Sequence, residues 1–318
     1  MKQPLIILTG PTASGKTALS VRLAREIGGE IISADSMQVY RHMDIGSAKV
    51  TEAEMGGIRH HLIDVLEPWD EFNVVIFQKM ALEAMEKIRA AGHIPIVAGG
   101  TGFYIQALLY HVNFTENDGD TKIREELSCF AQTRGADALH ERLRQVDPES
   151  AVAIHPNNVK RVIRALEFYE KTGTRISGHN EAERQKESPY QHAFYVLTMD
   201  RKRLYDRIDE RVDRMLENGL VEEVRKLQQM GCRKDMVSMQ GLGYKEILGY
   251  LDGSMTLEEA VYILKRDTRH FAKRQLTWFR RERDVCWLDW ETFGRNEDKM
   301  LSWILSDLEN KGIVIKEQ

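Results

Sequence analysis

The stretch GPTASGKT, residues 10–17, directly follows the apolar run LIILT and decides the fold. Its pattern is Gly10, four residues, then Gly15, Lys16 and Thr17, which is typical of a phosphate-binding loop between a strand and a helix. The two glycines permit the tight turn that aims backbone N–H groups at one anion, and the helix N-terminus adds partial positive charge. The loop therefore predicts a bound phosphate or diphosphate, but it does not specify a nucleotide.

We assign all eight residues of this loop to the phosphate site. Lys16 supplies a point charge, and the hydroxyl of Thr17 is a candidate ligand for Mg²⁺. The other predicted contributors are Gly10, Pro11, Thr12, Ala13, Ser14 and Gly15. An ordinary glycine-rich turn is the alternative, and the spacing behind a strand disfavours it.

The composition is that of a protein with a substantial core. The 318 residues are 42% hydrophobic, and this length favours two domains. The net charge of −4 argues against a protein that coats nucleic acid, unless basic residues gather on one surface. The three cysteines, Cys129, Cys232 and Cys286, lie far apart, which argues against both a disulfide framework and a zinc site.

No apolar stretch of the sequence approaches the length of a membrane span. The first residues, MKQPLIILTG, are expected to enter a core strand rather than to form a signal peptide. The expected compartment is therefore the cytoplasm, without membrane association. The sequence does not indicate an obligate protein partner, so we expect a monomer.

The alternation of apolar runs and amphipathic segments predicts an α/β core that begins with residues 1–114. Runs such as EIISA and HIPIVAGG alternate with helical segments such as FQKMALEAMEKIRAAG, which indicates a parallel sheet flanked by helices. Residues 115–189 are charged, helical and poor in strand signals, which predicts an inserted all-helical domain. The strand-like HAFYVLTM then returns the chain to the core, which residues 190–318 complete with long helices.

Polar residues follow two of these apolar runs. Asp35 comes after EIISA, and Thr101 comes after IPIVAGG. The carboxyl ends of neighbouring parallel strands share one edge of a sheet, so Asp35 should lie on the same rim as the phosphate loop. There it could accept a proton, and Thr101 could hydrogen-bond a phosphate oxygen, although both residue types also cap helices. The amide of Gln38 could pair with an adenine edge, and a plain surface glutamine is the alternative.

Two helical segments gather positive charge in this acidic chain. In NNVKRVIRALEFYE, helical spacing separates an apolar face from a basic arc made by Lys160, Arg161 and Arg164. The segment 265–284 interleaves Lys and Arg with aromatic residues, among them Trp278, which is typical of a surface for single-stranded RNA. The alternatives are a solvated charged face for the first segment and a basic helix with core aromatics for the second.

The segment RLYDRIDERVDRMLENGLVEEV spaces four arginines so that several share one helix face. Such cations could neutralise a departing diphosphate, and we choose Arg207 and Arg211 as the candidates. Pairing with neighbouring acidic residues is the ordinary explanation for such arginines. The bend QGLGYKE, residues 240–246, could contact the backbone of a nucleic acid or be a simple turn.

Seven blocks in order along nearly the whole chain resemble the bacterial tRNA dimethylallyltransferases, also called tRNA isopentenyltransferases. The blocks are GPTASGKT, SADSMQVYRHMDIGSAK, IPIVAGGTGFYIQAL, NNVKRVIRALE, RVDRMLENGLVEEV, QGLGYKE and AKRQLTWFRR. One block alone would be weak evidence, because kinases and ATPases share the phosphate loop. The resemblance implies Mg²⁺-dependent transfer of a dimethylallyl group from dimethylallyl diphosphate to N6 of the adenosine just 3′ of a tRNA anticodon.

The resemblance also implies roles for individual residues. Residues 12–17 would bind the diphosphate of the donor, Asp35 would be the general base, and Thr101 would lie near the reaction centre. Lys16, Arg207 and Arg211 would stabilise the departing diphosphate. The expected contacts with the tRNA anticodon stem-loop are Asp35, Ser36, Met37, Gln38, Thr101, Arg124, Val159, Lys160, Arg161, Val162, Ile163, Arg164, Gln240, Gly241, Gly243, Lys245, Lys273, Arg274, Gln275, Trp278 and Arg280.

Three other functions are alternatives. A small-molecule kinase would hold ATP in the same loop and use an acidic residue after the second strand to deprotonate a hydroxyl. A prenyltransferase of free adenine nucleotides would share the donor, but it would give the helical insertion and the basic aromatic segment little purpose. An RNA-binding regulator with a phosphate-dependent switch is a non-enzymatic alternative.

Overall fold

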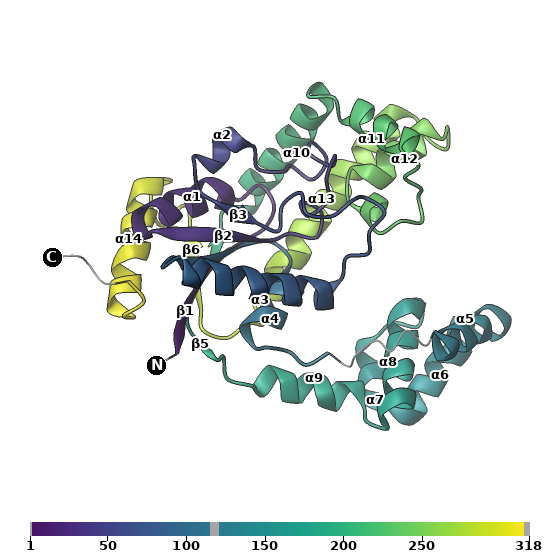
Figure 1. The fold of residues 1–318 in the computed structure, drawn as a ribbon. Coiled ribbons are helices and arrows are strands. Elements are labelled where there is room, and N and C mark those ends of the chain that lie inside the picture. The colour runs from purple at the N-terminus through teal and green to yellow at the C-terminus, as the bar shows by residue number, and fades with distance from the viewer. Residues whose placement is uncertain (1, 115–120, 315–318) are drawn as a thin grey trace. The chain divides into compact units, whose positions relative to one another are not determined.

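The computed structural model describes residues 2–114 and 121–314, and the chain divides into two compact units (Figure 1). Unit 1 comprises Met1–Leu109 and Pro189–Gln318, and unit 2 is the continuous segment Tyr110–Ser188. The start that the sequence analysis assigns to the insertion, residue 115, lies outside the described residues. The chain thus leaves unit 1 once and returns to it once.

Unit 1 is built on a six-stranded parallel sheet with the order β3-β2-β4-β1-β5-β6. The strands are β1 Gln3–Thr9, β2 Gly29–Ala34, β3 His60–His61, β4 Ile94–Gly99, β5 Tyr190–Thr198 and β6 Val285–Asp289. Residues 5–8 of β1 are buried on both faces of the sheet, as expected for a parallel sheet that helices cover. The prediction of an α/β fold with a parallel sheet is confirmed.

Helices cover both faces of this sheet. Ile6 and Leu8 share an apolar cluster with side chains of α1 and α14, and α3 packs on β2 and β4 from the other side (Figure 1). The helices of unit 1 are α1 Lys16–Ile27, α2 Glu52–Met55, α3 Val74–Ala90, α4 Gly102–Leu109, α10 Arg201–Glu217, α11 Leu220–Gln229, the 3₁₀ helix η1 Ser238–Gln240, α12 Tyr244–Leu251, α13 Leu257–Phe279 and α14 Glu297–Asn310. Over residues 2–114 and 121–314, none of the helices has the length and apolar character needed to cross a bilayer.

Unit 2 is helical throughout its described residues. Its helices are α5 Lys122–Arg134, α6 Ala136–Val146, α7 Pro148–Ala153, α8 Val159–Thr172 and α9 Ile176–Gln185. Leu139, Leu143 and Val162 are fully buried in an apolar cluster made by residues of this unit alone. The buried carboxylate of Asp147 accepts hydrogen bonds from the hydroxyls of Ser150 and Ser177, each at 2.7 Å. Unit 2 therefore has a core and an internal polar anchor of its own.

Candidate functional site at the phosphate loop

The phosphate loop connects β1 to α1 and depends on its two glycines. Gly10 and Gly15 have positive φ angles of 153° and 93°. A Cβ on Gly10 would lie 2.9 Å from the carbonyl oxygen of Leu197, and one on Gly15 would lie 3.2 Å from the ring of Trp290. The glycines are therefore required by the folded loop itself as well as by the approach of an anion.

Two side chains from distant segments brace the loop. Gln275 of α13 accepts a hydrogen bond from the Thr12 N–H at 2.9 Å and donates to the Gly100 carbonyl at 3.0 Å. The indole N–H of Trp290 donates to the Ser14 carbonyl at 2.8 Å. Both side chains are buried. The loop is thus joined to the turn after β4 and to the end of β6.

Gln275 and Trp290 brace the loop in a way that the sequence did not indicate. Gln275 is only 6% exposed and its amide is used inside unit 1, and its expected contact with tRNA stays a prediction. Trp290 lies just beyond a short apolar run, and no spacing signal connects it to a loop 276 positions earlier. Only the packing of β6 beside β5 brings it there.

Two cations gather at the loop. The Lys16 ammonium donates to the Pro11 carbonyl at 3.3 Å, and the Arg211 guanidinium donates to the Thr12 hydroxyl at 3.3 Å. Burial and the charge of Arg211 lower the pKa of Lys16 to about 8, and the nearby Asp35 opposes this change. Burial likewise lowers the pKa of Arg211, against the effect of Asp35. Cations whose charged forms are destabilised in this way favour the binding of an anion.

Arg207 lies one turn before Arg211 on α10. One of its guanidinium nitrogens is 4.0 Å from the place of a Cβ on Gly15, so it lies beside the loop. Burial and the like charge of Arg203 and Arg214 lower the pKa of Arg207. Neither Arg207 nor Arg211 forms an ion pair within the described residues, whereas Arg203 pairs with Glu291 at 3.3 Å. The structure thus brings both candidate arginines to the loop.

A buried hydroxyl in the loop also lacks a partner. The Oγ atom of Ser14 is buried without any hydrogen bond in the described structure. A buried hydroxyl normally finds a partner, so an unpaired one inside a loop of backbone N–H groups fits a site for a phosphate oxygen. Thr17, at the first turn of α1, is exposed. Its hydroxyl is therefore accessible to a hard cation such as Mg²⁺.

Asp35 follows β2 at the edge of the sheet where the phosphate loop also lies. Its Oδ1 atom accepts hydrogen bonds from the N–H groups of Met37 at 2.8 Å and Gln38 at 3.4 Å. Its Oδ2 atom accepts none from the described residues. One oxygen therefore caps the following turn, as the alternative interpretation expected, and the other is available to accept a proton.

Thr101 lies beside Asp35. Its N–H donates to the carbonyl of Ala34, the residue before Asp35, at 3.2 Å. Its own carbonyl accepts the N–H groups of Tyr104 and Ile105 and so begins α4. The ends of β1, β2 and β4 thus place the phosphate loop, Asp35 and Thr101 on one rim of the sheet.

The remaining candidate tRNA contacts of unit 1 fall into two groups. Lys273 and Arg274 of α13, Arg280 at its C-terminal cap and Gln240 are exposed, and Lys245 is half-buried near two acidic residues. The bend at residues 240–246 reaches the segment after Asp35, since a Cβ on Gly241 would lie 2.5 Å from the methyl group of Met37. Gly243 has a positive φ of 93° at the start of α12, and Ser36 is half-buried.

Trp278 is half-buried with its ring against Phe103, at a centroid distance of 6.0 Å. Its indole N–H is buried and has no hydrogen-bond partner in the described structure. Phe103 is 42% exposed and stands at the first turn of α4, beside Thr101. An aromatic pair therefore adjoins the rim that carries the reactive candidates.

In unit 2, the structure separates the candidate tRNA contacts of α8 into two faces. Lys160, Arg161 and Arg164 are exposed, as the helical spacing predicts. Val162 and Ile163 are 0% and 7% exposed in the core, and Val159 packs against the same cluster. The side chains of Val162 and Ile163 therefore belong to the core of unit 2, and the expected contact of these two residues with tRNA stays a prediction.

Arg124 of α5 is already paired inside unit 2. Its guanidinium donates to both carboxylate oxygens of Glu167, at distances of 3.0 and 3.1 Å. Glu167 is 4% exposed, and its buried negative charge would be destabilising without the guanidinium of Arg124. In the described structure Arg124 therefore has a structural partner, and its contact with tRNA stays a prediction.

Metal ligation by side-chain clusters is not a feature of the described residues. Among residues 2–114 and 121–314 there is no group of three or more His, Cys, Asp or Glu side chains that could hold a metal ion. A cation at the loop would therefore take most of its ligands from a bound diphosphate and from water, as Mg²⁺ commonly does.

Comparison with known proteins identifies the same family along almost the whole chain. A family model described as IPP transferase matches residues 38–282, and a second described as isopentenyl transferase matches residues 3–67. The chain is 59% identical to a tRNA dimethylallyltransferase of Lachnoclostridium phytofermentans, with 98% of this chain and 99% of the relative aligned. It is 51% identical to one of Acetivibrio thermocellus, over 92% of this chain and 94% of the relative.

Solved structures agree. The chain is similar to a tRNA isopentenylpyrophosphate transferase of Bacillus halodurans, with 46% identity, a TM-score of 0.73 and 98% of each chain covered. It is also similar to a eukaryotic dimethylallyltransferase acting on tRNA, with 29% identity, a TM-score of 0.81 and 99% and 81% of the two chains covered.

Proposed function

The chain belongs to the tRNA dimethylallyltransferase family, and on that premise we propose that it transfers a dimethylallyl group from dimethylallyl diphosphate to tRNA. The acceptor is N6 of the adenosine 3′-adjacent to the anticodon, and diphosphate is released. One observation carries the proposal: Lys16 and Arg211 meet at the phosphate loop while Asp35 lies within reach of their charge. The site thus offers cations for a leaving diphosphate and a carboxylate for the proton.

The reaction is a substitution at carbon. The lone pair of adenine N6 forms a bond to the allylic carbon of the donor, and the bond from that carbon to the diphosphate oxygen breaks with its electron pair. The proton of N6 passes to Oδ2 of Asp35, the carboxylate oxygen without a hydrogen bond. The Oδ1 bonds to Met37 and Gln38 hold the carboxylate in place during this step.

The leaving diphosphate is stabilised by groups already directed at the loop. These are backbone N–H groups of the loop other than those of Thr12 and Ser14, which already have partners, the Ser14 hydroxyl, which is unpaired in the described structure, and the cations Lys16, Arg207 and Arg211. Charge that develops on the departing oxygen meets donors that the fold has already gathered there. The burial that lowers the pKa of Lys16 also excludes water that would compete for the donor.

We propose Mg²⁺ as the cofactor, held by the Thr17 hydroxyl and by oxygens of the bound diphosphate. The exposed hydroxyl and the lack of a carboxylate cluster in the described residues fit such a cation. When bound, Mg²⁺ supplies charge neutralisation for the diphosphate. The protein residues still supply orientation, proton transfer and most of the positive charge.

Each unit exposes cations that could contact the acceptor. In unit 1 these are Lys273 and Arg274 of α13 and Arg280 at its C-terminal cap, and in unit 2 they are Lys160, Arg161 and Arg164 of α8. Contacts of this kind bind phosphates of an RNA backbone without reading its sequence. The target adenosine must leave its stack for N6 to reach the donor. Binding of the RNA to the protein offsets the free energy that this unstacking costs. A tRNA substrate is consistent with a cytoplasmic enzyme.

The test is incubation with labelled dimethylallyl diphosphate, Mg²⁺ and an anticodon stem-loop, followed by nucleoside analysis. We expect N6-dimethylallyladenosine at the position 3′ to the anticodon. Parallel reactions with AMP and with ATP are the controls. A rate with AMP equal to that with the stem-loop would favour the enzyme of free nucleotides, and consumption of ATP without prenylated adenine would favour the kinase.

A further inference from the structure

Glu223 of α11 holds a loop far from it in sequence. Its carboxylate accepts hydrogen bonds from three successive backbone N–H groups, those of Asp44 at 2.8 Å, Ile45 at 2.8 Å and Gly46 at 3.0 Å. Three consecutive donors directed at one carboxylate form a strong charge-assisted contact. The loop that follows Asp35 and Gln38 is thereby fastened to a helix about 180 residues later in the chain.

Tyr244 of α12 completes this contact. Its hydroxyl donates to Glu223 at 2.9 Å and accepts the Ser47 N–H at 3.1 Å. A Cβ on Gly46 would lie 2.6 Å from the Tyr244 ring, so the ring and the loop backbone are in direct contact. We call Glu223 and Tyr244 together the loop clamp.

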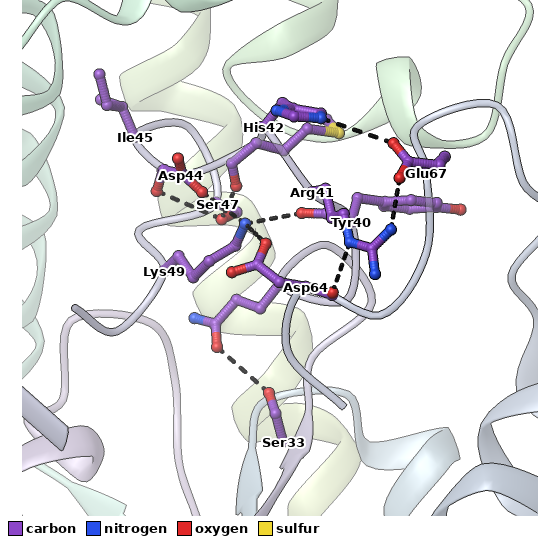
Figure 2. A network of polar contacts seen from close by, with 12 residues as sticks. Ser33, Tyr40, Arg41, His42, Asp44, Ile45, Ser47, Lys49, Asp64 and Glu67 are labelled. Atoms are coloured by element: carbon purple, nitrogen blue, oxygen red, sulfur yellow. Dashed lines mark hydrogen bonds and ion pairs between the residues drawn. The ribbon is translucent and has the colours of Figure 1, made fainter. Parts of the chain in front are cut away.

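Lys49 contacts polar groups from several positions in and beside the loop. Its ammonium donates to the Tyr40 carbonyl at 2.7 Å and pairs with the carboxylates of Asp44 and Asp64 (Figure 2). The side chain of Lys49 is only 6% exposed although both carboxylates are much more open. The loop from Tyr40 to Lys49 is thus a compact turn rather than a free segment.

The loop contains strained backbone at the place where it meets Gln38. Ala48 has a positive φ of 46°, which costs an alanine roughly 1–2 kcal/mol. Such a conformation persists only when the surroundings impose it. The loop clamp holds residues 44–47, immediately before Ala48. Lys49, immediately after Ala48, is held by its own ion pair with Asp64.

The strained residue orients the amide of Gln38. Gln38 Nε2 donates to the Ala48 carbonyl at 3.1 Å, and Gln38 Oε1 accepts from the Ser33 hydroxyl at 3.3 Å. The Ala48 carbonyl can only accept, so it determines which end of the amide is the NH₂ group, and the Ser33 hydroxyl then donates to the oxygen. An amide has two N–H donors and two acceptor lone pairs, so one donor and one acceptor are left for a ligand. That is the pair which matches an adenine edge.

We propose that Glu223 and Tyr244 are positioning residues that hold the Gln38 amide, through the loop at residues 44–48, in the orientation that recognises the target adenine. The inference rests on the proposed transfer to tRNA. The clamp touches no reacting atom, and its effect is on which base is accepted. Glu223 and Tyr244 therefore act as determinants of specificity.

The test compares substrates that keep the reactive amine but lose a ring acceptor beside it. Anticodon stem-loops would carry adenosine, 1-deazaadenosine or 7-deazaadenosine at the target position. For the unmutated protein, we expect kcat/KM to fall about 10-fold or more on one of the two analogues, because one ring nitrogen accepts from Gln38. In E223Q and Y244F this preference for adenosine should shrink to within about 2-fold, as it should in Q38A.

A double-mutant cycle and a matched control make the test specific. Adding E223Q to Q38A should not reduce the preference further, because the clamp acts only through Gln38. Glu222 is the neighbouring residue of α11, 61% exposed and paired with Arg225, so E222Q should keep the full preference. Donor affinity should stay unchanged in all of these variants.

Each outcome decides the inference. An adenosine preference in E223Q and Y244F equal to that of the unmutated protein would overturn it, as would equal rates of the unmutated protein on all three substrates. Faster hydrogen exchange at the backbone amides of residues 44–47 in E223Q, with an unchanged melting temperature, would show that the clamp was released without unfolding. Absence of any prenylated product from the unmutated protein would overturn the proposed function, and this inference with it.

Discussion

At the scale of single residues, Asp35 divides its two oxygens between structure and chemistry. Oδ1 caps the turn that carries Gln38, and Oδ2 accepts no hydrogen bond from the described residues. The structure shows the cap at Oδ1, and the proposed role as a base would use the other oxygen of the same side chain. A substitution that preserves the cap can separate them.

Replacement of Asp35 by Asn should slow the chemical step by roughly 10²- to 10⁴-fold, because the amide keeps an acceptor for the cap but cannot take the proton. Donor affinity should not fall, because the substitution removes a negative charge beside Lys16 and Arg211 and no hydrogen bond joins Asp35 to the loop in the described structure. Single-turnover prenyl transfer and calorimetry measure the two quantities. Transfer at the unmutated rate would remove Asp35 from the role of base.

The lowered pKa of Lys16, about 8, gives diphosphate binding a definite pH dependence. Below this pKa the amine is already protonated in the free protein, so the charge is present before binding. As the pH rises through 8 the free protein loses the proton, which a bound anion would hold, so affinity should fall with rising pH. Calorimetry across this range measures the slope. The variant Lys16→Met should bind weakly without the slope, and the same slope in that variant would assign it to another group.

At the scale of elements, α13 has a buried and an exposed face. Gln275 points into unit 1 and braces the phosphate loop, whereas Lys273, Arg274 and Arg280, at the C-terminal cap, are exposed. The sequence showed this helix as one basic aromatic stretch. Substitutions of its buried residues and of its exposed residues should therefore affect the binding of different ligands.

The variant Gln275→Ala should weaken the binding of dimethylallyl diphosphate by about 10-fold or more, because the Thr12 N–H and the Gly100 carbonyl lose their buried partner. Calorimetry with the donor measures this loss. Thr277 on the same helix is exposed and bonds only within α13, so Thr277→Ala is the control that should bind normally. Unchanged donor affinity in Gln275→Ala would show that the loop holds its shape without this brace.

Replacement of Lys273, Arg274 and Arg280 by Gln should weaken tRNA binding and flatten its dependence on salt, by roughly one unit of slope per lost phosphate contact. Donor affinity should not change. Lys202 is exposed too, but it is paired with Asp206 at 2.8 Å, and Lys202→Gln serves as the control. If the triple variant keeps the full salt slope, these residues do not contact the RNA backbone.

At the scale of the whole molecule, each of the two units has an apolar core of its own. The residues around the phosphate loop all belong to unit 1, and Leu143 is fully buried among side chains of unit 2. Destabilisation of one core should therefore affect the ligands of that unit first.

The variant Leu143→Ala should destabilise unit 2 by about 2–5 kcal/mol, because it leaves a cavity in a closely packed cluster. tRNA affinity should fall while donor affinity is retained. Val152 of α7 is 91% exposed, so Val152→Ala is the matched control without effect. Calorimetric melting and binding of both ligands measure the result. Loss of donor binding together with tRNA binding would show that the phosphate site depends on unit 2.

Helical periodicity correctly predicted which side chains of α8 are buried. Spacing placed Val162 and Ile163 on an apolar face opposite Lys160, Arg161 and Arg164, and the structure buries the first two and exposes the other three. The resemblance assigned residues 159–163 to tRNA contact as one block. Burial follows from the repeat of the helix, whereas a resemblance marks a block of sequence and not the face that each side chain occupies.

The sequence by itself determined the phosphate loop, the parallel sheet and the rim that carries Asp35 and Thr101. Each depends on residues close together in the chain: glycines at fixed spacing, apolar runs of strand length, and strand ends that share an edge. Tertiary structure alone decided that Gln275 and Trp290 brace the loop and that Glu223 holds residues 44–46. Those contacts span 177 to 276 positions, and a single polar side chain carries no periodic signal of the partner that folding will bring to it.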